Sequence, residues 1–306
     1  MLDESRLVWP VFFIGMGRSG TTLIFESFSS HRDLGWLSNY CDMFPQQLWL
    51  NVLCPLLDNR WLSLRGFKAQ YSSHLPGNRY FPQPDEAYAF WDRYGTADFS
   101  DTYLLDRRAT EEESQRSRRA VARVLRYQAR HRFTAKITGP GRVTWLQSVF
   151  PDARFIHLVR DGRAVVDSLL RVDFWRARGL HAPFWKDPLP PISKKQWQAA
   201  DGDPAVLAAV QWVNVLRTIR QEAERLPGSA AFTEIRYEDF TADPGKTLSE
   251  MYRFAELDVY PGLMERALGR VPILNFKDKY RHNLGSATVE RITAVMRPEL
   301  ERYGYA

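Results

Sequence analysis

Short apolar runs bounded by turn residues occur along the chain and predict buried β-strands. They cover residues 8–14, 133–137, 153–159 and 231–236. The segments between and after them predict helices, which cover about residues 20–30, 110–130, 142–150, 162–170, 204–226, 244 onward and 286–303. Strands separated by helices predict an α/β fold, in which a P-loop-type parallel sheet is flanked by helices on both faces.

The helix expected to end near residue 130 has the clearest start signal. Thr110 and Glu113 have the spacing of a capping box, in which each side chain accepts a hydrogen bond from the other residue's backbone N–H. This helix carries a set of arginines that we expect to spread over several faces and to be mostly solvated: Arg116, Arg118, Arg119, Arg123, Arg126 and Arg130.

Two aromatic-rich segments, residues 36–105 and 172–203, lack clean periodicity. Short helices are expected in the first, and loops in both. A chain of 306 residues lies near the upper limit for one domain. We therefore predict a single domain over residues 1–306, with these two segments as insertions that bind the substrate.

Charge and composition narrow the classes of partner. The net charge of +6 suits an anionic ligand, but the basic residues are too few and too mixed with acids to predict nucleic-acid binding. The 2 cysteines cannot form a disulfide framework, and no Cys/His group has zinc spacing. No apolar run approaches the ~18 residues of a membrane span, so a cytoplasmic location is expected.

The segment from Gly15 to Thr22 carries the first candidate chemistry. A buried strand, a glycine-rich turn and a helix start form a cradle in which backbone N–H groups converge on an anion. The spacing of Gly15 and Gly20 approaches that of the nucleotide-triphosphate loop, but Thr21 stands where that motif has lysine, and a cation comes earlier at Arg18. This favours a nucleotide with its reactive group on a single 5′-phosphate over ATP. A tight turn without a ligand is the alternative.

A second candidate lies at the end of the strand predicted over residues 153–159. Arg160 follows this strand, and Ser168 lies about two turns into the next helix. An arginine fork and a hydroxyl can share one phosphate. The alternative is an arginine paired with Asp161 and an incidental serine. Both candidates follow the carboxyl ends of strands, where ligands bind in parallel sheets.

Together the two features resemble the sulfotransferases that use 3′-phosphoadenosine 5′-phosphosulfate (PAPS). In that superfamily a strand–loop–helix binds the 5′-phosphosulfate, and a later strand supplies an Arg and, eight residues on, a Ser for the 3′-phosphate. Arg160 and Ser168 have that separation. The Arg-Ser-Gly-Thr-Thr run at residues 18–22 resembles the branch that contains tyrosylprotein sulfotransferases and many bacterial relatives.

Further similarities extend the resemblance across almost the whole chain. They lie at residues 150–157, 236–240, 279–281 and 303–305. The family usually has Trp where Tyr280 stands, and the ring is kept. The fold that the resemblance implies is sulfotransferase-like.

The resemblance also implies roles for individual residues. The residues implied to bind the 5′-phosphate and sulfonate are Gly17, Arg18, Ser19, Gly20, Thr21 and Thr22. Arg160 and Ser168 are implied to bind the 3′-phosphate. Tyr237 is a further phosphate contact, and Arg171 is a weaker candidate because its offset does not match well.

Sulfonate transfer leaves negative charge growing on the 5′-phosphate oxygen, so fixed cations there stabilise the transition state. Arg18 is one such cation. Lys136 is the other, since family members carry a lysine on the equivalent strand. The alternative for Lys136 is a solvated lysine at a strand end. No metal is expected, because a single phosphate-type group carries the developing charge.

The general base cannot be carried over from the family. The cytosolic branch has a His two residues beyond its lysine, where this chain has Thr138. The tyrosylprotein branch has a Glu some twenty residues after its loop arginine, where this chain has Asn39. The remaining candidates are Asp42, His74, Asp85 and Glu86. We select Glu86, because bacterial relatives often have acidic residues after a proline in this region.

The acceptor pocket is expected between residues 36–105 and 172–200. The second segment offers apolar or stacking contacts through Phe174, Trp175, Phe184, Trp185 and Trp197. The predicted activity is transfer of sulfonate from PAPS to a hydroxyl or amine of a small-molecule, lipid or glycan acceptor. The absent family bases leave an inactive homologue that binds 3′-phosphoadenosine 5′-phosphate (PAP) as one alternative, and the glycine spacing leaves a P-loop kinase or NTPase as another.

Overall fold

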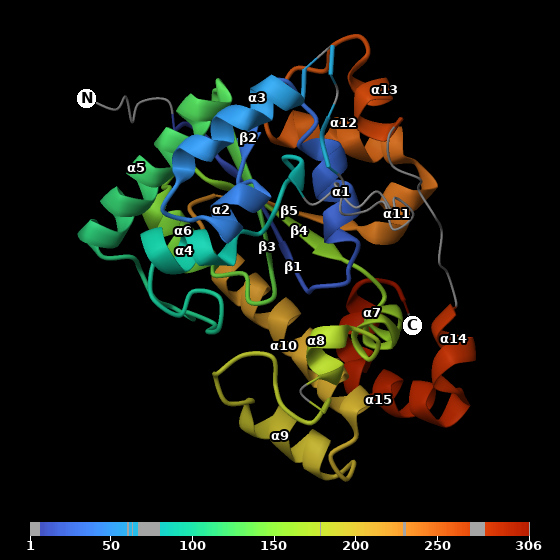
Figure 1. Cartoon of the computed structure of the whole chain (residues 1–306). Helices are drawn as coiled ribbons and strands as arrows, with labels where there is room; N and C mark the ends of the chain where they lie inside the picture. Colours follow the sequence, from blue (N-terminus) through green and yellow to red (C-terminus); the bar gives the residue numbers. More distant parts are fainter. Residues whose placement is uncertain are drawn as a thin grey trace.

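In the computed structural model, a five-stranded parallel sheet lies at the centre of the protein with helices on both faces (Figure 1). The structure describes residues 7–59, 61–62, 64–66, 80–177, 179–228, 231–269 and 279–305. The strand order is β2-β3-β1-β4-β5, with bounds β1 Val11–Gly15, β2 Leu34–Trp36, β3 Arg132–Thr138, β4 Arg154–Val159 and β5 Phe232–Arg236. The predicted α/β fold is confirmed.

Each face of the sheet is covered by its own group of helices. The first group is α1 (Thr21–Phe28), α11 (Tyr237–Ala242), α12 (Pro244–Phe254) and α13 (Leu263–Leu268). The second is α4 (Tyr88–Tyr94), α5 (Glu111–Gln128), α6 (Val143–Val149), α7 (Gly162–Leu169), α10 (Pro204–Ala223) and α15 (Ser286–Arg302). The shorter elements are α2 (Asn39–Met43), η2 (Leu48–Val52), α3 (Leu53–Leu57), α8 (Asp173–Arg176), α9 (Pro191–Gln198) and α14 (Lys279–Leu284).

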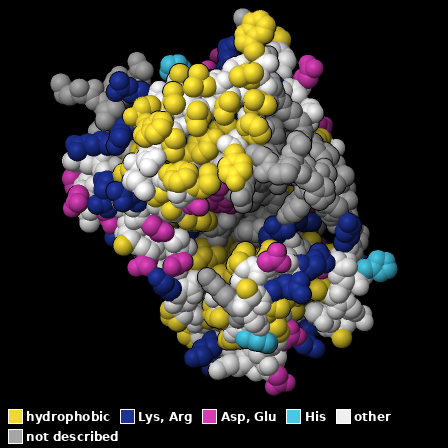
Figure 2. All heavy atoms as spheres, viewed as in Figure 1, with side chains coloured by type: hydrophobic (Ala, Val, Ile, Leu, Met, Phe, Trp, Pro, Cys, Tyr) yellow, Lys and Arg dark blue, Asp and Glu magenta, His cyan; other side chains and the backbone are white. Residues whose placement is uncertain are grey.

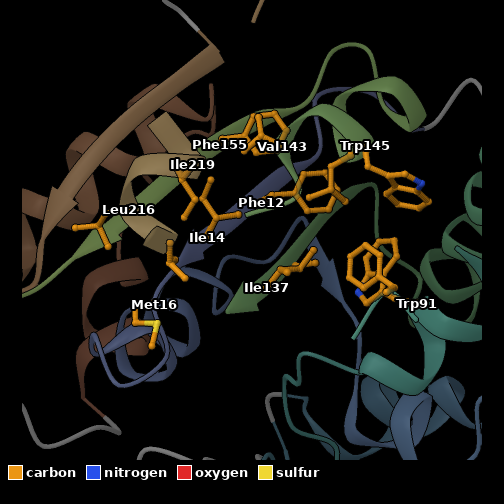
Figure 3. Close-up of a cluster of buried hydrophobic side chains, with 14 of the residues drawn as sticks. Phe12, Ile14, Met16, Trp91, Ile137, Val143, Trp145, Phe155, Leu216 and Ile219 are labelled. Atoms are coloured by element: carbon orange, nitrogen blue, oxygen red, sulfur yellow. The ribbon is translucent and has the colours of Figure 1, made fainter. Parts of the chain in front are cut away.

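The alternation of side chains along β1 divides the core into two layers. Phe12 and Ile14 face the α5, α6 and α10 side, where they pack with Trp145 and Ile219 (Figure 3). Val11 and Phe13 point to the opposite face and pack against α1 and α12. Because both faces of a parallel sheet are buried, such a strand reads as a continuous apolar run, which is why β1 could be predicted from the sequence.

The capping box is confirmed at the start of α5. Thr110 Oγ1 accepts from the N–H of Glu113 at 3.2 Å, and Glu113 Oε2 accepts from the N–H of Thr110 at 3.0 Å. Among the described residues, no helix has the combination of length and apolar character needed to cross a bilayer.

Three of the departures from the predicted elements have a clear local cause. β1 begins at Val11 rather than at residue 8, because Trp9 has a φ of 47° and Pro10 has no N–H to pair. β2 was not predicted, since it is three residues long and pairs only with β3 at the sheet edge. The segment 172–203, predicted as loops, contains α8 and α9, and α9 begins with proline at its first turn.

Candidate functional site

Three strand ends meet at one edge of the sheet, because β1 lies between β3 and β4 and all three run parallel. Gly15 ends β1 with a φ of 146°, and a Cβ there would lie 2.4 Å from the carbonyl oxygen of Leu158 in β4. Only glycine allows this close approach. The loop after β1, Thr138 at the end of β3 and Arg160 after β4 therefore share one site.

The loop from residues 16 to 20 has the features of an anion cradle. Gly20, the N-cap of α1, offers no side-chain acceptor, and the first turn of α1 holds no acidic residue. The N–H groups of that turn thus keep their positive partial charge for a ligand. Ser19 is fully buried, and its Oγ has no hydrogen-bond partner among the described residues. A phosphate or sulfonate oxygen fits this hydroxyl and helix start.

The two predicted anion-binding features are in direct contact. Arg18 has a φ of 70°, and its Nε donates to Ser168 Oγ in α7 at 2.9 Å. Arg160 Nη1 donates to the carbonyl oxygen of Arg18 at 3.1 Å. Asp161, the alternative partner of Arg160, instead accepts from Arg163 Nη2 at 2.8 Å. The two arginines lie close enough for one nucleotide to reach both.

Tyr237 closes this site from the side of β5. It is the first residue of α11, and the Arg160 guanidinium carbon lies 4.5 Å from the centroid of its ring. A Cβ on Gly20 would lie 2.2 Å from Tyr237 Cδ2, so the ring packs directly on the loop. Burial raises the pKa of Tyr237. Its hydroxyl therefore stays protonated at neutral pH and can donate to an anion.

Lys136 lies on β3 with its side chain on the same face of the sheet as α1. Its neighbours Ala135 and Ile137 pack in the opposite layer, so strand alternation directs Lys136 toward α1. Its Nζ donates to Thr22 Oγ1 at 2.9 Å and lies 2.8 Å from Glu86 Oε1. The side chain is 1% exposed, so the alternative of a solvated lysine is wrong.

Glu86 reaches this lysine from the segment before α4. An isolated bridge joins Ser38 to Pro84, and the N–H of Asp85 donates to the Leu37 carbonyl oxygen at 2.8 Å. These contacts attach the segment to the chain just after β2, at the same sheet edge. The Glu86 side chain is 18% exposed.

The other predicted candidates lie in different surroundings. Asp42 Oδ1 accepts from the N–H of Ala89 at 3.0 Å, and Asp85 Oδ1 accepts from the N–H of Ala87 at 3.3 Å. His74 lies outside the described residues. Arg171 donates to both carboxylate oxygens of Asp167, at 2.7 and 2.6 Å. None of these contacts involves Lys136.

Aromatic residues from both insertions meet at the end of β3. Tyr88 OH donates to the Thr138 carbonyl oxygen at 2.6 Å, and burial raises the pKa of Tyr88 to about 12. The Trp185 ring covers Gly139, where a Cβ would lie 2.6 Å from Trp185 Cζ2. Tyr103 packs edge-on against Trp185 with ring centroids 5.4 Å apart.

Tyr88 and Tyr103 could not be assigned a role from the sequence. No local pattern marks them, since their position depends on the packing of distant segments. Among the aromatic residues predicted to line the acceptor pocket, Trp175 is fully buried in the core, whereas Phe174 is exposed. Phe184, Trp185 and Trp197 are partly buried against the same core.

Comparison with protein families matches residues 10–261 to the one described as the sulfotransferase family. The chain belongs to this family. The sulfotransferase activity and the PAPS-dependent class predicted from the sequence are thereby confirmed.

Two curated relatives of this sulfotransferase come from mycobacteria, and a third comes from a mammal. The chain is 26% identical over 322 residues to the omega-hydroxy-beta-dihydromenaquinone-9 sulfotransferase Stf3 of Mycobacterium bovis, covering 97% of this chain and 75% of the relative. The Stf3 of Mycobacterium tuberculosis matches to the same extent. Carbohydrate sulfotransferase 2 of Mus musculus is 32% identical over 135 residues, which cover 38% of this chain.

Solved structures of sulfotransferases share the fold. STF9 of Mycobacterium avium has a TM-score of 0.63 at 20% identity and covers 97% of this chain and 77% of its own. The sulfotransferase domain of the curacin biosynthetic pathway has a TM-score of 0.53 at 14% identity, with 98% and 99% covered. The sheet and its flanking helices are therefore those of a sulfotransferase.

Proposed function

We propose that this chain transfers the sulfonate group of PAPS to the hydroxyl of an apolar, lipid-like acceptor. It does so as a single domain over residues 1–306, in which segments 36–105 and 172–203 form the acceptor side, meaning the part of the site that binds the acceptor. The observation that carries the proposal is the contact of Lys136 Nζ with both Thr22 Oγ1 and Glu86 Oε1. It joins the phosphosulfate loop, a cation and a candidate base in one place.

The loop residues Gly17 to Thr22 hold the 5′-phosphate and the sulfonate. Support comes from the buried Ser19 hydroxyl, which has no hydrogen-bond partner in the described part of the chain, and from the start of α1, where Gly20 offers no side-chain cap. Arg160 and Ser168 hold the 3′-phosphate, and the Tyr237 hydroxyl adds a donor beside them. The Arg-Ser-Gly-Thr-Thr form of this loop supports the proposal that the chain is closest to the bacterial and tyrosylprotein-type branch.

PAPS supplies the sulfonate group, which passes to the acceptor oxygen as PAP departs. Arg18 and Lys136 stabilise the negative charge that develops on the 5′-phosphate oxygen. Glu86 takes the proton of the acceptor hydroxyl on its carboxylate. A protonated Glu86 no longer attracts the ammonium group of Lys136, so proton uptake frees that cation for the departing phosphate oxygen.

Residues around the end of β3 support the proposed acceptor class. Trp185 and Tyr103 present rings there, and the buried Tyr88 hydroxyl is occupied by the Thr138 carbonyl oxygen. Such a surface favours apolar contact over sugar recognition, which needs many polar groups. The mycobacterial Stf3 relatives are named for a hydroxylated dihydromenaquinone, which is a lipid. The cytoplasmic location and the lack of a metal requirement remain predictions.

The test is turnover of radiolabelled PAPS with a panel of acceptors. Long-chain primary alcohols and hydroxylated isoprenoid quinones are expected to release PAP and to take up label, and simple sugars are expected to react poorly. PAP binding without turnover on any acceptor would show that the chain is an inactive homologue. Absence of PAP binding would refute the assigned donor, and preference for sugars would refute the acceptor class.

A further inference from the structure

One face of the protein carries a broad hydrophobic surface, seen as the yellow field over α2 and α3 in Figure 2. Residues 43–57, between Asp42 and Asp58, include no charged side chain. We call the exposed hydrophobic side chains from Met43 to Leu64, together with Tyr80, the apolar patch. It holds nine of the fifteen large hydrophobic side chains that are exposed among the described residues, including Trp61 at 79% and Leu56 at 56%.

Buried polar contacts fix the orientation of this segment. Asn51 Oδ1 in η2 accepts from Ser38 Oγ at 2.8 Å and from Gln128 Nε2 at 3.0 Å. Leu48 and Cys54 are buried on the same side. With one side anchored in this way, Trp49, Val52 and Leu56 are directed to solvent. An exposed hydrophobic surface held in place by the fold marks an interaction site.

Basic residues border the apolar patch. Helix α5 packs against η2, and its exposed Arg119, Arg123 and Arg126 are spaced four and three residues apart, so they share one helix face. Figure 2 shows Lys and Arg side chains along the border of the yellow field over α5. Arg116 and Arg118 contact the backbone carbonyl oxygens of Gly95 and Val149 instead, so the arginines of α5 lie on several faces of the helix, as expected.

We propose that the apolar patch and the α5 arginines dock this enzyme on an anionic lipid bilayer. Trp49, Trp61 and Tyr80 combine an apolar ring with a polar group, which suits the zone between acyl chains and headgroups. Arginines at the edge attract acidic headgroups. A protein partner of matching shape is the alternative. The exposed arginines on α5 favour the bilayer, because their positive charge complements anionic headgroups.

The docking surface lies next to the acceptor side of the site. α2 follows β2 at the sheet edge where the strands end, and the bridge between Ser38 and Pro84 joins this region to the segment that carries Glu86. An acceptor hydroxyl at the membrane surface would thereby be delivered toward the proposed base. The proposal extends the proposed function, but its evidence is independent of PAPS chemistry.

The experiment is sedimentation of the full chain with vesicles of phosphatidylcholine alone or mixed with phosphatidylglycerol. We expect binding that is stronger to the mixed vesicles. Trp49→Ser combined with Trp61→Ser is expected to weaken it about tenfold or more, because each ring leaves the interface. Arg123→Glu with Arg126→Glu is expected to abolish the preference for the anionic vesicles. The matched control, Val8→Ser with Val259→Ser, removes exposed apolar side chains elsewhere and should bind as the wild type does.

Three results would overturn the proposal. These are no vesicle binding by the wild type, equal binding by the tryptophan variant, or a wild-type dimer in solution that the tryptophan variant lacks. The last would make the apolar patch a self-association surface. PAP affinity and the thermal midpoint of each variant report its folding. Vesicle binding without PAP binding would refute the proposed function while leaving the docking surface supported, so the two failures are distinguishable.

Discussion

Arg18 Nε donates to Ser168 Oγ at 2.9 Å, although the two residues lie 150 positions apart in the chain. This contact joins the loop after β1 to the helix after β4. The residues proposed to hold the 5′-phosphosulfate and the 3′-phosphate therefore form one continuous anion site. Nucleotide recognition can be dissected by ligands that carry one or both phosphates.

Arg160→Ala is expected to weaken PAP binding about 10–100-fold, the loss typical of charge-assisted hydrogen bonds. Binding of adenosine 5′-monophosphate, which lacks the 3′-phosphate, should change about threefold or less. Isothermal titration with both nucleotides measures this. Ser168→Ala should show the same pattern more weakly, and the exposed Arg176→Ala is the control. Equal losses for both nucleotides would mean that Arg160 does not recognise the 3′-phosphate.

Lys136→Ala is expected to lower kcat about 100–1000-fold, because a fixed cation acts on charge that develops in the transition state. PAP affinity should fall much less. Steady-state kinetics combined with PAP titration separates the two effects. Lys246→Ala, at an exposed position of α12, serves as the matched control. If affinity and turnover fall together, Lys136 is only a binding residue.

Glu86→Gln is expected to reduce kcat about 10²–10⁴-fold while keeping the size of the side chain. The acidic limb of the wild-type pH–rate profile should disappear from the residual activity. Glu86→Asp should retain part of the activity by keeping a carboxylate. A profile for Glu86→Gln with an unchanged acidic limb would assign the base to another residue.

Gly20→Ala and Gly17→Ala test the loop geometry within one motif. Gly20 has a φ of 78°, and a Cβ there would lie 2.2 Å from the Tyr237 ring, whereas a Cβ on Gly17 would meet nothing within 4 Å. We expect Gly20→Ala to lower the free energy of unfolding by about 1–3 kcal/mol and to weaken PAP binding. Gly17→Ala should leave stability nearly unchanged. Urea unfolding measures the free energy of unfolding of both variants. Equal values for the two variants would contradict the predicted clash at Gly20.

Acid should destabilise the protein partly through His157. This ring is fully buried in β4, its Nδ1 lies 2.9 Å from Glu234 Oε1, and burial lowers its pKa below 6.5. Below pH 6.5 the unfolded chain binds a proton that the folded chain does not. Stability therefore falls as the pH drops from about 6.5 toward the folded-state pKa, by at most about 1.4 kcal/mol per pH unit.

Glu234 acts in the same direction at lower pH. Its pKa is lowered despite burial, by the hydrogen bonds that it forms with His157 and Tyr303, so its contribution is lost as the pH falls below the ordinary value of 4.5. His157→Gln removes the first effect. Urea unfolding between pH 5 and 7.5 should give a smaller loss for the variant than for the wild type. The same slope in both would assign the acid sensitivity elsewhere.

The sequence by itself determined the elements whose signals are local. The strand, turn and helix around Gly15–Thr22, and the arginine and serine around β4 and α7, depend on spacing within one segment. Strand alternation in β3 is also local and places Lys136 on the α1 face. The sequence pattern of a buried strand or a capped helix is contained within a few neighbouring residues, so these features could be predicted.

Only the tertiary structure decided which distant residues meet. The contact of Glu86 with Lys136 depends on the bridge between Ser38 and Pro84, and the cover of Gly139 by Trp185 depends on how residues 172–203 fold back. The apolar patch likewise could not be predicted, because the sequence does not indicate which apolar side chains are buried and which face solvent. These relationships arise from packing between segments far apart in the chain, which no local pattern encodes.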